Sequence, residues 1–313
     1  MTALSTRERR AGSAPHRASR PQRPTRRRPR LLPFAVPATA IYLLMVLIPM
    51  VLSFYYSFTD RSLLYPGADF VGVDNYRRLL TDPAFLRPFG FTTVLTIAML
   101  VLPNAAGLAV AMLLDRVGRF VFALRLVFFV PAVLSGVIVA FLWSTILTDD
   151  GLLNHLLGTV GLDGLRTSWL GQPRSAQTSV VLVSAWQAVA LCVVVYLAGL
   201  QTIPRELYDA ARIDGAGAWQ AFRRVTWPLL APALTINSTL LLINGFKTYD
   251  IPVVLNGTGP AGATRTIATE VIRVGFTVNR AGLASAMAVV MLVVVGAIAA
   301  ITLKLLQRRE VSS

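Results

Sequence analysis

Few residues of this 313-residue chain could carry out covalent chemistry. The single cysteine, Cys192, lies in an apolar stretch, and neither His16 nor His155 has neighbours at metal-ligand spacing. The G-x-x-x-x-G-K-[ST] pattern that cradles phosphates does not occur, and the nearest Gly-rich segment, 257–260, lacks a lysine. The longest uncharged stretches hold no pair of carboxylates. We therefore expect no catalytic residue, no metal site, no cofactor and no enzymatic activity in this polypeptide.

A few polar side chains lie within or at the end of apolar stretches, where they are costly and usually face a cavity. Amides and hydroxyls along a pathway suit a solute rich in hydroxyl groups. The candidate residues for such a pathway are Ser184, Gln187, Asn237, Asn244 and Lys247. Two alternatives stay open at this point. The uncharged groups could bond between helices, and the lysine could extend to the membrane interface.

Spacing places these side chains on two helix faces. Ser184 and Gln187 are three residues apart, and the two asparagines are seven apart with Thr248 four residues further on. Residues at these intervals share one side of a helix. Lys247 is also placed to pair with Asp250 at i+3.

Six stretches without any ionisable residue must position these side chains. Each exceeds the roughly 20 residues that a helix needs to cross about 30 Å of hydrocarbon. Only 14% of the residues are charged, against about 25% in soluble domains. We expect an all-α integral membrane protein with six transmembrane helices. The uncharged runs are 31–59, 88–114, 126–148, 175–204, 225–246 and 281–303, and the predicted helices lie near 35–58, 89–114, 122–146, 179–200, 228–249 and 281–304.

The distribution of charge predicts the orientation in the membrane. Segment 1–30 carries ten arginines and one glutamate. Two connections on the same side, 115–125 and 201–227, have net charges of about +2 and +1. The connections on the other side are near neutral or slightly negative. The positive-inside rule therefore predicts that both termini are cytoplasmic. We interpret 1–30 as a disordered topogenic tail and not as a nucleic-acid-binding segment. The expected location is a plasma membrane, with a multi-pass chain.

These boundaries predict a simple organisation. It consists of a basic cytoplasmic tail (1–30), a first transmembrane helix with its outer loop (31–86), a core of five transmembrane helices that contains the cytoplasmic loop 201–227 (87–306), and a short cytoplasmic tail (307–313).

The sequence of the cytoplasmic loop predicts two short helices, which is unusual for a connecting segment. Glu206 lies at the start of an uninterrupted segment that ends at Ile213, where an acidic side chain favours the positive end of a helix. Residues 215–217 (Gly-Ala-Gly) predict a turn, and 218–225 predict a second helix with Arg223 in its last turn. Pro228 is expected to open the fifth span.

The spacing within this loop resembles the Glu-Ala-Ala loop motif of ATP-binding-cassette importer permeases. That pattern has Glu-Ala-Ala, Gly, Ile and Leu-Pro at fixed intervals. Here the corresponding residues are Asp209, Ala210, Ala211, Gly215, Val225, Trp227 and Pro228. Trp227, where the family has leucine, is the one departure that changes bulk.

Further segments resemble the carbohydrate-uptake branch of this family, in the same order along the chain. Together they extend the resemblance over about residues 31–306. The segments are 70–76 (FVGVDNY), 151–154 (GLLN), 169–171 (WLG), 197–201 (LAGLQ), 203–204 (IP) and 282–286 (GLASA).

The resemblance implies a type I importer permease fold and a defined set of partners. They are a second, related permease subunit, two cytoplasmic ATPase subunits that bind ATP in place of this chain, and an extracellular solute-binding protein or lipoprotein. The lipid bilayer surrounds the assembly, and the substrate is expected to be a sugar or oligosaccharide. The residues expected to couple the loop to the ATPase are Glu206, Asp209, Ala210, Ala211, Gly215, Arg223 and Pro228.

Two other functions remain possible on the sequence alone. One is a permease of the same type for glycerol phosphate or another small solute, because Lys247, Arg265 and Arg273 are expected near the outer face. The other is an ion-coupled secondary transporter. It is disfavoured because the uncharged runs contain no Asp or Glu, whereas such transporters usually carry acidic residues within the membrane.

Overall fold

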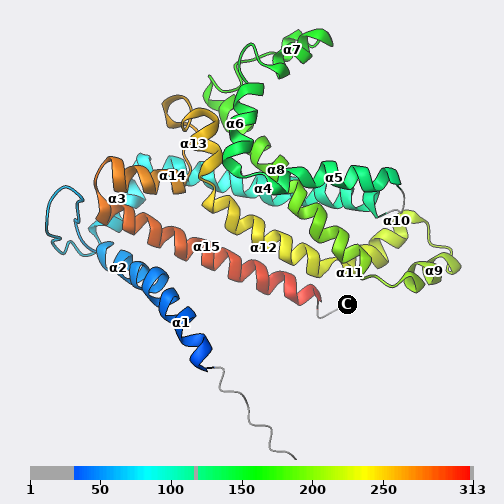
Figure 1. Cartoon of the computed structure of the whole chain (residues 1–313), viewed down its shortest axis with the longest axis horizontal. Coiled ribbons are helices and arrows are strands. Elements are labelled where there is room, and N and C mark those ends of the chain that lie inside the picture. Colours follow the sequence, from blue (N-terminus) through cyan, green and yellow to red (C-terminus); the bar gives the residue numbers. More distant parts are fainter. Residues whose placement is uncertain (1–31, 116–118, 311–313) are drawn as a thin grey trace, which may run out of the picture. The chain divides into compact units, whose positions relative to one another are not determined.

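The computed structural model describes residues 32–115 and 119–310 (Figure 1). The predicted tail 1–30 therefore lies outside the described residues. The chain divides into two compact units, one that ends at Ile48 and one that starts at Pro49. The first unit contains α1 (Leu32–Tyr42) and the π-helical turn η1 (Leu43–Leu47).

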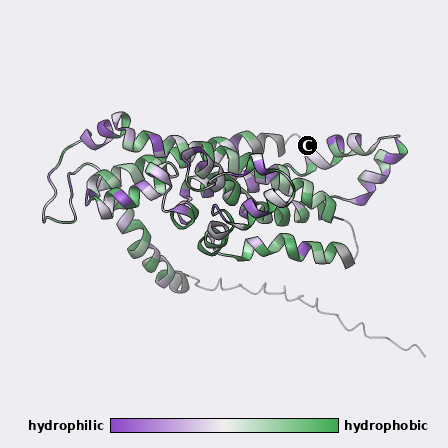
Figure 2. Ribbon diagram, turned by 90° about the horizontal axis from the view of Figure 1, so that it is seen from above, coloured by the Kyte–Doolittle hydropathy of each residue, from purple (hydrophilic) through white to green (hydrophobic). Residues whose placement is uncertain are grey.

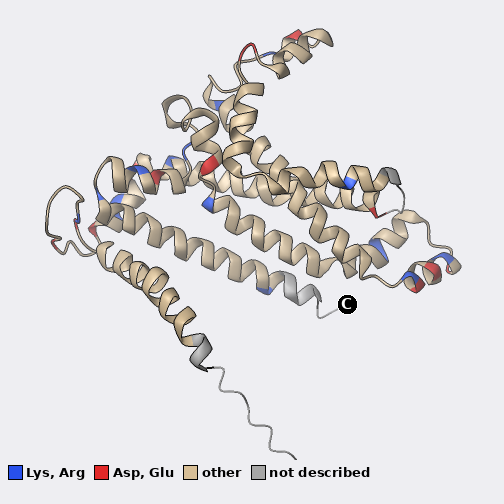
Figure 3. Cartoon of the chain, in the orientation of Figure 1, with Lys and Arg blue, Asp and Glu red and all other residues tan. Residues whose placement is uncertain are grey.

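The described residues contain four helices that are long and apolar enough to cross a membrane, or six if two bent helix pairs each count as one span. The four are Val36–Tyr56, Pro83–Leu114, Pro173–Gln201 and Ala281–Leu305. Within the second unit, charged residues gather at helix ends and in the connections (Figure 3). The all-helical architecture with up to six spans is thus confirmed.

The second unit is built on two long helices, α4 (Pro83–Leu114) and α8 (Pro173–Gln201), which pack along each other. Two further helices pack on this pair and a third packs on the second of them, and the resulting bundle is apolar along most of its length (Figure 2). They are α5 (Arg119–Val133), α12 (Ala231–Lys247) and α15 (Ala281–Glu310).

Small residues let these helices approach closely, as membrane helices require because hydrophobic burial does not drive their association. A Cβ atom on Gly107 would collide with the Cβ of Cys192 across the α4–α8 contact. A Cβ atom on Gly245 of α12 would lie 2.8 Å from Thr96 Oγ1 of α4.

Two of the candidate spans are bent helix pairs. The expected helix 122–146 bends by 104° between α5 and α6 (Gly136–Ile146). Ser135 forms this break, because its Oγ accepts a hydrogen bond from the N–H of Ile138 and so caps α6.

The second break alters the expected role of Pro228. The helical segments before it are α10 (Ala218–Ala221), the π-helical turn η3 (Phe222–Thr226) and α11 (Trp227–Leu229). Together they bend by 63° against α12, which begins at Ala231 with a proline in its first turn. Pro228 therefore precedes the break and does not open the long part of the fifth span.

At the end of the bundle opposite α9 (Arg205–Ile213), short elements replace the long helices (Figure 1). They are α3 (Asp74–Thr81), α13 (Asp250–Asn256), the 3₁₀ turn η4 (Pro260–Gly262), α14 (Ile267–Ile272) and the π-helical turn η5 (Arg273–Thr277). A buried amide joins two of the segments at this end. The Nδ2 of Asn75 donates to the carbonyls of Ser57 and Thr59, at 2.9 and 2.8 Å.

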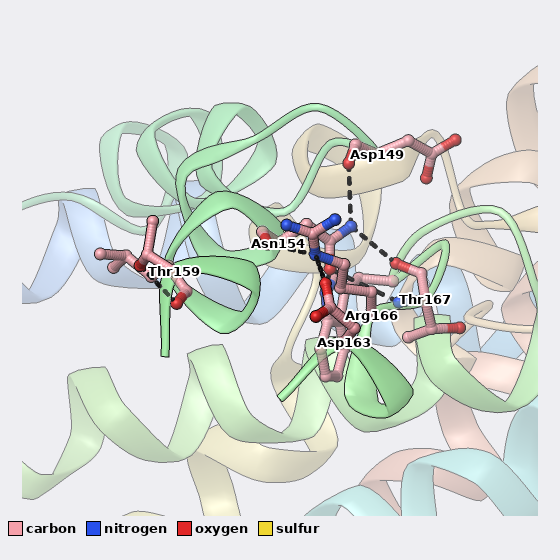
Figure 4. Close-up of polar contacts among 8 residues, drawn as sticks. Asp149, Asn154, Thr159, Asp163, Arg166 and Thr167 are labelled. Carbon is pink, nitrogen blue, oxygen red and sulfur yellow. Dashed lines mark hydrogen bonds and ion pairs between the residues drawn. The ribbon is translucent and has the colours of Figure 1, made fainter. Parts of the chain in front are cut away.

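The connection between α6 and α8 is held together by one asparagine (Figure 4). It contains α7 (Leu152–Thr159) and the 3₁₀ turn η2 (Asp163–Leu165). The side chain of Asn154 donates to the carbonyls of Asp149 and Thr167, and it accepts a hydrogen bond of 2.9 Å from Trp169 Nε1. Two separate stretches that carried the family resemblance thus meet in space.

We expect Gly107→Val to destabilise the bundle by about 1–3 kcal/mol, because the added methyl groups must separate α4 from α8. The measurement is the thermal unfolding midpoint of the assembled transporter. Gly90→Ala, on the same helix, is the matched control, since a Cβ atom there meets nothing within 4 Å. Equal midpoints for the two variants would contradict the close packing at Gly107.

Candidate functional site

The loop between α8 and α12 begins with the predicted short helix. Pro204 precedes α9 in an extended conformation, and Glu206 lies in the first turn. A carboxylate there stabilises the positive end of the helix. Ala210 is exposed and Ala211 half-buried, so that α9 presents small residues to its surroundings. The turn and the start of the second helix also lie where the sequence placed them.

Gly215 ends α9 in a left-handed conformation with φ of +76°. The N–H of Gly215 donates to the carbonyl of Arg212, and the N–H of Ala216 to the carbonyl of Ala211, at 3.0 and 2.8 Å. This is the Schellman pattern, which requires positive φ at the glycine position. A Cβ atom at Gly215 would meet no atom within 4 Å, so the local reason for glycine is backbone conformation.

Side chains fasten the two arms of the loop to each other. The hydroxyls of Tyr208 on α9 and Thr226 in η3 share a hydrogen bond of 3.0 Å. On the second arm, the rings of Trp219, Phe222 and Trp227 form a row with centroids 5.5 and 6.1 Å apart. Trp227 thus packs on Phe222 and is accommodated at the surface, which resolves its departure from the family pattern.

The ionisable residues of the loop remain accessible. Asp209 Oδ1 lies 3.5 Å from Arg212 Nη1, and both side chains are largely exposed, so this ion pair contributes little to stability. Arg223 is also exposed. Two apolar side chains of this surface that were not among the predicted coupling residues are exposed, Ile213 at 86% and Trp219 at 71%. Both lie at helix ends, Ile213 between Arg212 and Asp214 and Trp219 next to Gln220, which was the available signal.

A cavity of about 890 Å³ lies between the loop and the adjoining ends of α4 and α8. Asp115 of α4 and Arg205, Asp209 and Arg212 of α9 line it. Burial raises the pKa of Asp115, while the charges of Arg125 and Arg205 oppose that rise. Outside the long helices, the structure thus places charged groups of both signs around one hollow.

A second cavity, of about 440 Å³, lies where the long helices break. It unites four of the five residues predicted to line a solute pathway. Its lining includes the end of α12, the start of α13, the start of α6 and the middle of α8. The four predicted residues are Ser184, Gln187, Asn244 and Lys247.

Asn237 is the predicted residue that lies outside this cavity. Its side chain is fully buried two turns before Asn244, beside the hydroxyl of Tyr196. The hydroxyl of Ser184, by contrast, lines the cavity while being buried and without a partner there.

Gln187 has a structural task at the broken third span. Its Nε2 donates a hydrogen bond of 2.9 Å to the carbonyl of Leu134, which the break between α5 and α6 leaves without a helical partner. Membrane proteins must satisfy such freed backbone groups, because the bilayer core supplies no water. The amide therefore lines the cavity and stabilises the break that shapes it.

The predicted ion pair between Lys247 and Asp250 does not form. Among the described residues the two side chains share no salt bridge, because α12 ends at Lys247 and Thr248 is extended with ψ of 115°. Asp250 begins the separate helix α13, so the i+3 geometry is lost. Both charged groups line the cavity instead, together with Tyr249.

Residues 103–311 match the family model described as binding-protein-dependent transport system inner membrane component. The chain belongs to this family of membrane-embedded, multi-pass transporter permeases.

Among related proteins, the probable starch degradation products transport system permease protein AmyD of Thermoanaerobacterium thermosulfurigenes is 32% identical, over 89% of this chain and 94% of the relative. The multiple sugar-binding transport system permease protein MsmF of Streptococcus mutans is 34% identical, over 84% and 90%. A chain of a bacterial ABC transporter for the import of alginate has the same fold, with a TM-score of 0.77, 24% identity and coverage of 89% and 95%. The chain is therefore a permease subunit of an ATP-driven, binding-protein-dependent importer.

We expect Gln187→Leu to lower the stability of the assembled transporter by about 1–3 kcal/mol, because the carbonyl of Leu134 loses its donor. Ser184→Ala, three residues away on the same helix, is the matched control. Its hydroxyl has no partner among the described residues, so this variant should be neutral. The thermal unfolding midpoint in detergent is measured for both variants. An unchanged midpoint in Gln187→Leu would show that the break does not need this hydrogen-bond donor.

Proposed function

We propose that this chain forms one half of the translocation path for a sugar or oligosaccharide. A second, related permease supplies the other half, and an extracellular solute-binding protein delivers the substrate. The observation that carries the proposal is the cavity of about 440 Å³ at the broken helices, lined by Ser184, Gln187, Asn244 and Lys247. Hydroxyls, amides and single charges of this kind suit hydrogen bonding to a neutral, hydroxyl-rich solute.

The names of the related proteins support the choice of substrate class, since they include transport systems for starch degradation products and for multiple sugars. A phosphorylated solute is less well supported by the charged residues. Arg273, one of three basic residues considered for it, forms an ion pair with the buried Glu270, where Nε and Oε2 lie 2.9 Å apart.

We further propose that two ATPase subunits dock on the two permeases, one on the surface formed here by α9 and its turn. Glu206, Asp209, Ala210, Ala211, Gly215, Arg223 and Pro228 contribute to it, together with the exposed Ile213 and Trp219. The ATPases bind and hydrolyse ATP, and this chain has no catalytic activity of its own. Charge asymmetry supports a cytoplasmic position for the loop and both termini, in a bacterial plasma membrane.

Gly215→Val should uncouple ATP hydrolysis from uptake. A β-branched residue is strained at a φ of +76°, so the end of α9 must rearrange against the ATPase. We expect solute uptake by reconstituted vesicles to fall at least about tenfold, given roughly 1–3 kcal/mol of backbone strain. Gly217→Ala is the control, since Gly217 has a φ of −70° and open space around a Cβ atom.

Two outcomes would count against this interpretation. Normal uptake by Gly215→Val would exclude the turn as part of the coupling surface. Uptake by the wild-type assembly in vesicles prepared without ATP would exclude an ATP-driven importer altogether and favour an ion-coupled carrier.

Asn244→Leu and Lys247→Gln should each change the selectivity or the apparent affinity for the transported sugar, because both side chains face the cavity. Removing one hydrogen-bonding partner of an enclosed substrate costs about 1–3 kcal/mol, or roughly 5- to 150-fold. Lys304→Gln, an exposed lysine near the end of α15, is the control for the loss of charge. If competition uptake assays with a panel of sugars show no change, these residues do not line the path.

A further inference from the structure

A third cavity, of about 850 Å³, opens at the end of the bundle opposite α9, between residues 87–98 of α4, residues 173–182 of α8 and the loop that follows α13. It shares no lining residue with the cavity at the broken helices. Three arginines line it, one from each segment: Arg87, Arg174 and Arg265. No Asp or Glu is part of its lining.

These three guanidinium groups have no counter-charge in the part of the chain that the structure describes. None of them belongs to any of the four ion pairs found there. The Nε of Arg265 is buried without a hydrogen-bond partner among those residues. A buried donor without an acceptor costs free energy. An anion in the cavity would accept a hydrogen bond from Arg265 Nε and would be attracted by the exposed guanidinium groups of Arg87 and Arg174.

The start of α8 adds donors to the same place. Gln172 precedes the helix without capping it, and Pro173 and Arg174 form its first turn. The backbone N–H groups of Arg174 and Ser175 have no acceptor within the described segments. The positive end of a 29-residue helix therefore points to the cavity, in the arrangement that favours binding of phosphate.

A strained loop holds Arg265 over the cavity. Thr258 and Ala261 adopt positive φ of 74° and 53°, which is costly for residues other than glycine. A Cβ atom on Gly262 would lie 2.7 Å from Arg265 Nε, so glycine leaves the space that the guanidinium fills. Gln177 Nε2 of α8 donates to the carbonyl of Ala263 at 2.8 Å and fixes the loop.

The floor of the cavity is apolar and continues along the membrane spans. On α4, Arg87, Phe91, Val94 and Ala98 follow one another at intervals of three or four residues and form a single stripe. Val181 and Leu182 of α8 extend it. Val94 and Leu182 are 61% and 53% exposed. A sugar would need polar walls at this depth, whereas a hydrocarbon chain would not.

We propose that this arginine-lined cavity binds an anionic phospholipid. The phosphate group lies among Arg87, Arg174 and Arg265 at the first turn of α8, and one acyl chain follows the stripe from Phe91 to Ala98. The site is separate from the solute path, so the inference does not depend on which solute is transported.

The test measures lipid binding to the purified, assembled transporter by native mass spectrometry, with phosphatidylglycerol as the probe and phosphatidylcholine as the zwitterionic comparison. The wild type should retain phosphatidylglycerol preferentially. Arg174→Gln combined with Arg265→Gln should weaken that binding about 30-fold, given the contribution of each arginine to anionic-lipid binding. The matched control combines Arg77→Gln with Arg280→Gln, two exposed arginines of the same end without an ion pair among the described residues.

Several results would overturn the proposal. They are equal binding of the two phospholipids by the wild type, unchanged binding in the cavity variant, and loss of binding in the control variant. Competition by inorganic phosphate at the same concentration as the phospholipid would indicate a site for a free anion instead.

If the cavity variant does not assemble, a labelling experiment on the wild-type transporter still tests the lipid site. Phosphatidylglycerol with a photoreactive group in its acyl chain should label peptides that contain 94–98 and 181–182. Labelling elsewhere, or protection of these peptides by the second permease subunit, would refute the lipid site.

Discussion

The absence of water from the bilayer core is the constraint on which this structure depends. A backbone group freed by a bend there must find a partner within the protein. The third span bends by 104°, and the amide of Gln187 binds the freed carbonyl of Leu134. The fifth ends at Thr248, whose carbonyl accepts a hydrogen bond of 2.7 Å from Thr266 Oγ1. Breaks with side-chain partners of this kind permit a polar cavity within otherwise apolar helices.

The same constraint explains how far the sequence could be interpreted. Uncharged runs of sufficient length predict spans without any knowledge of packing, and the expected number agrees with the structure once bent pairs are joined. The break at Ser135 could not be read in the same way, because a serine beside a glycine is compatible with both a cap and a continuous membrane helix. The choice depends on Gln187, which lies more than 50 residues away in the sequence.

The candidate sites show a similar division. Asn244 and Asn237 have the same chemistry and helical spacing, yet one lines the cavity and the other is completely buried. Spacing predicts which residues share a helix face, and the crossing of neighbouring helices decides which part of that face is open. The motif of the loop between α8 and α12 was easier to interpret, because its turn is determined by local hydrogen bonds around Gly215. Which residues of that loop contact a partner stays a prediction.

The close contact between α4 and α8 has a consequence for the only thiol of the chain. Cys192 is fully buried against Gly107, in the close contact between the two helices. A reagent can attack its Sγ atom only when these helices separate or the fold opens. The rate at which Cys192 is alkylated therefore reports how often the bundle opens. No additional cysteine has to be introduced for this measurement.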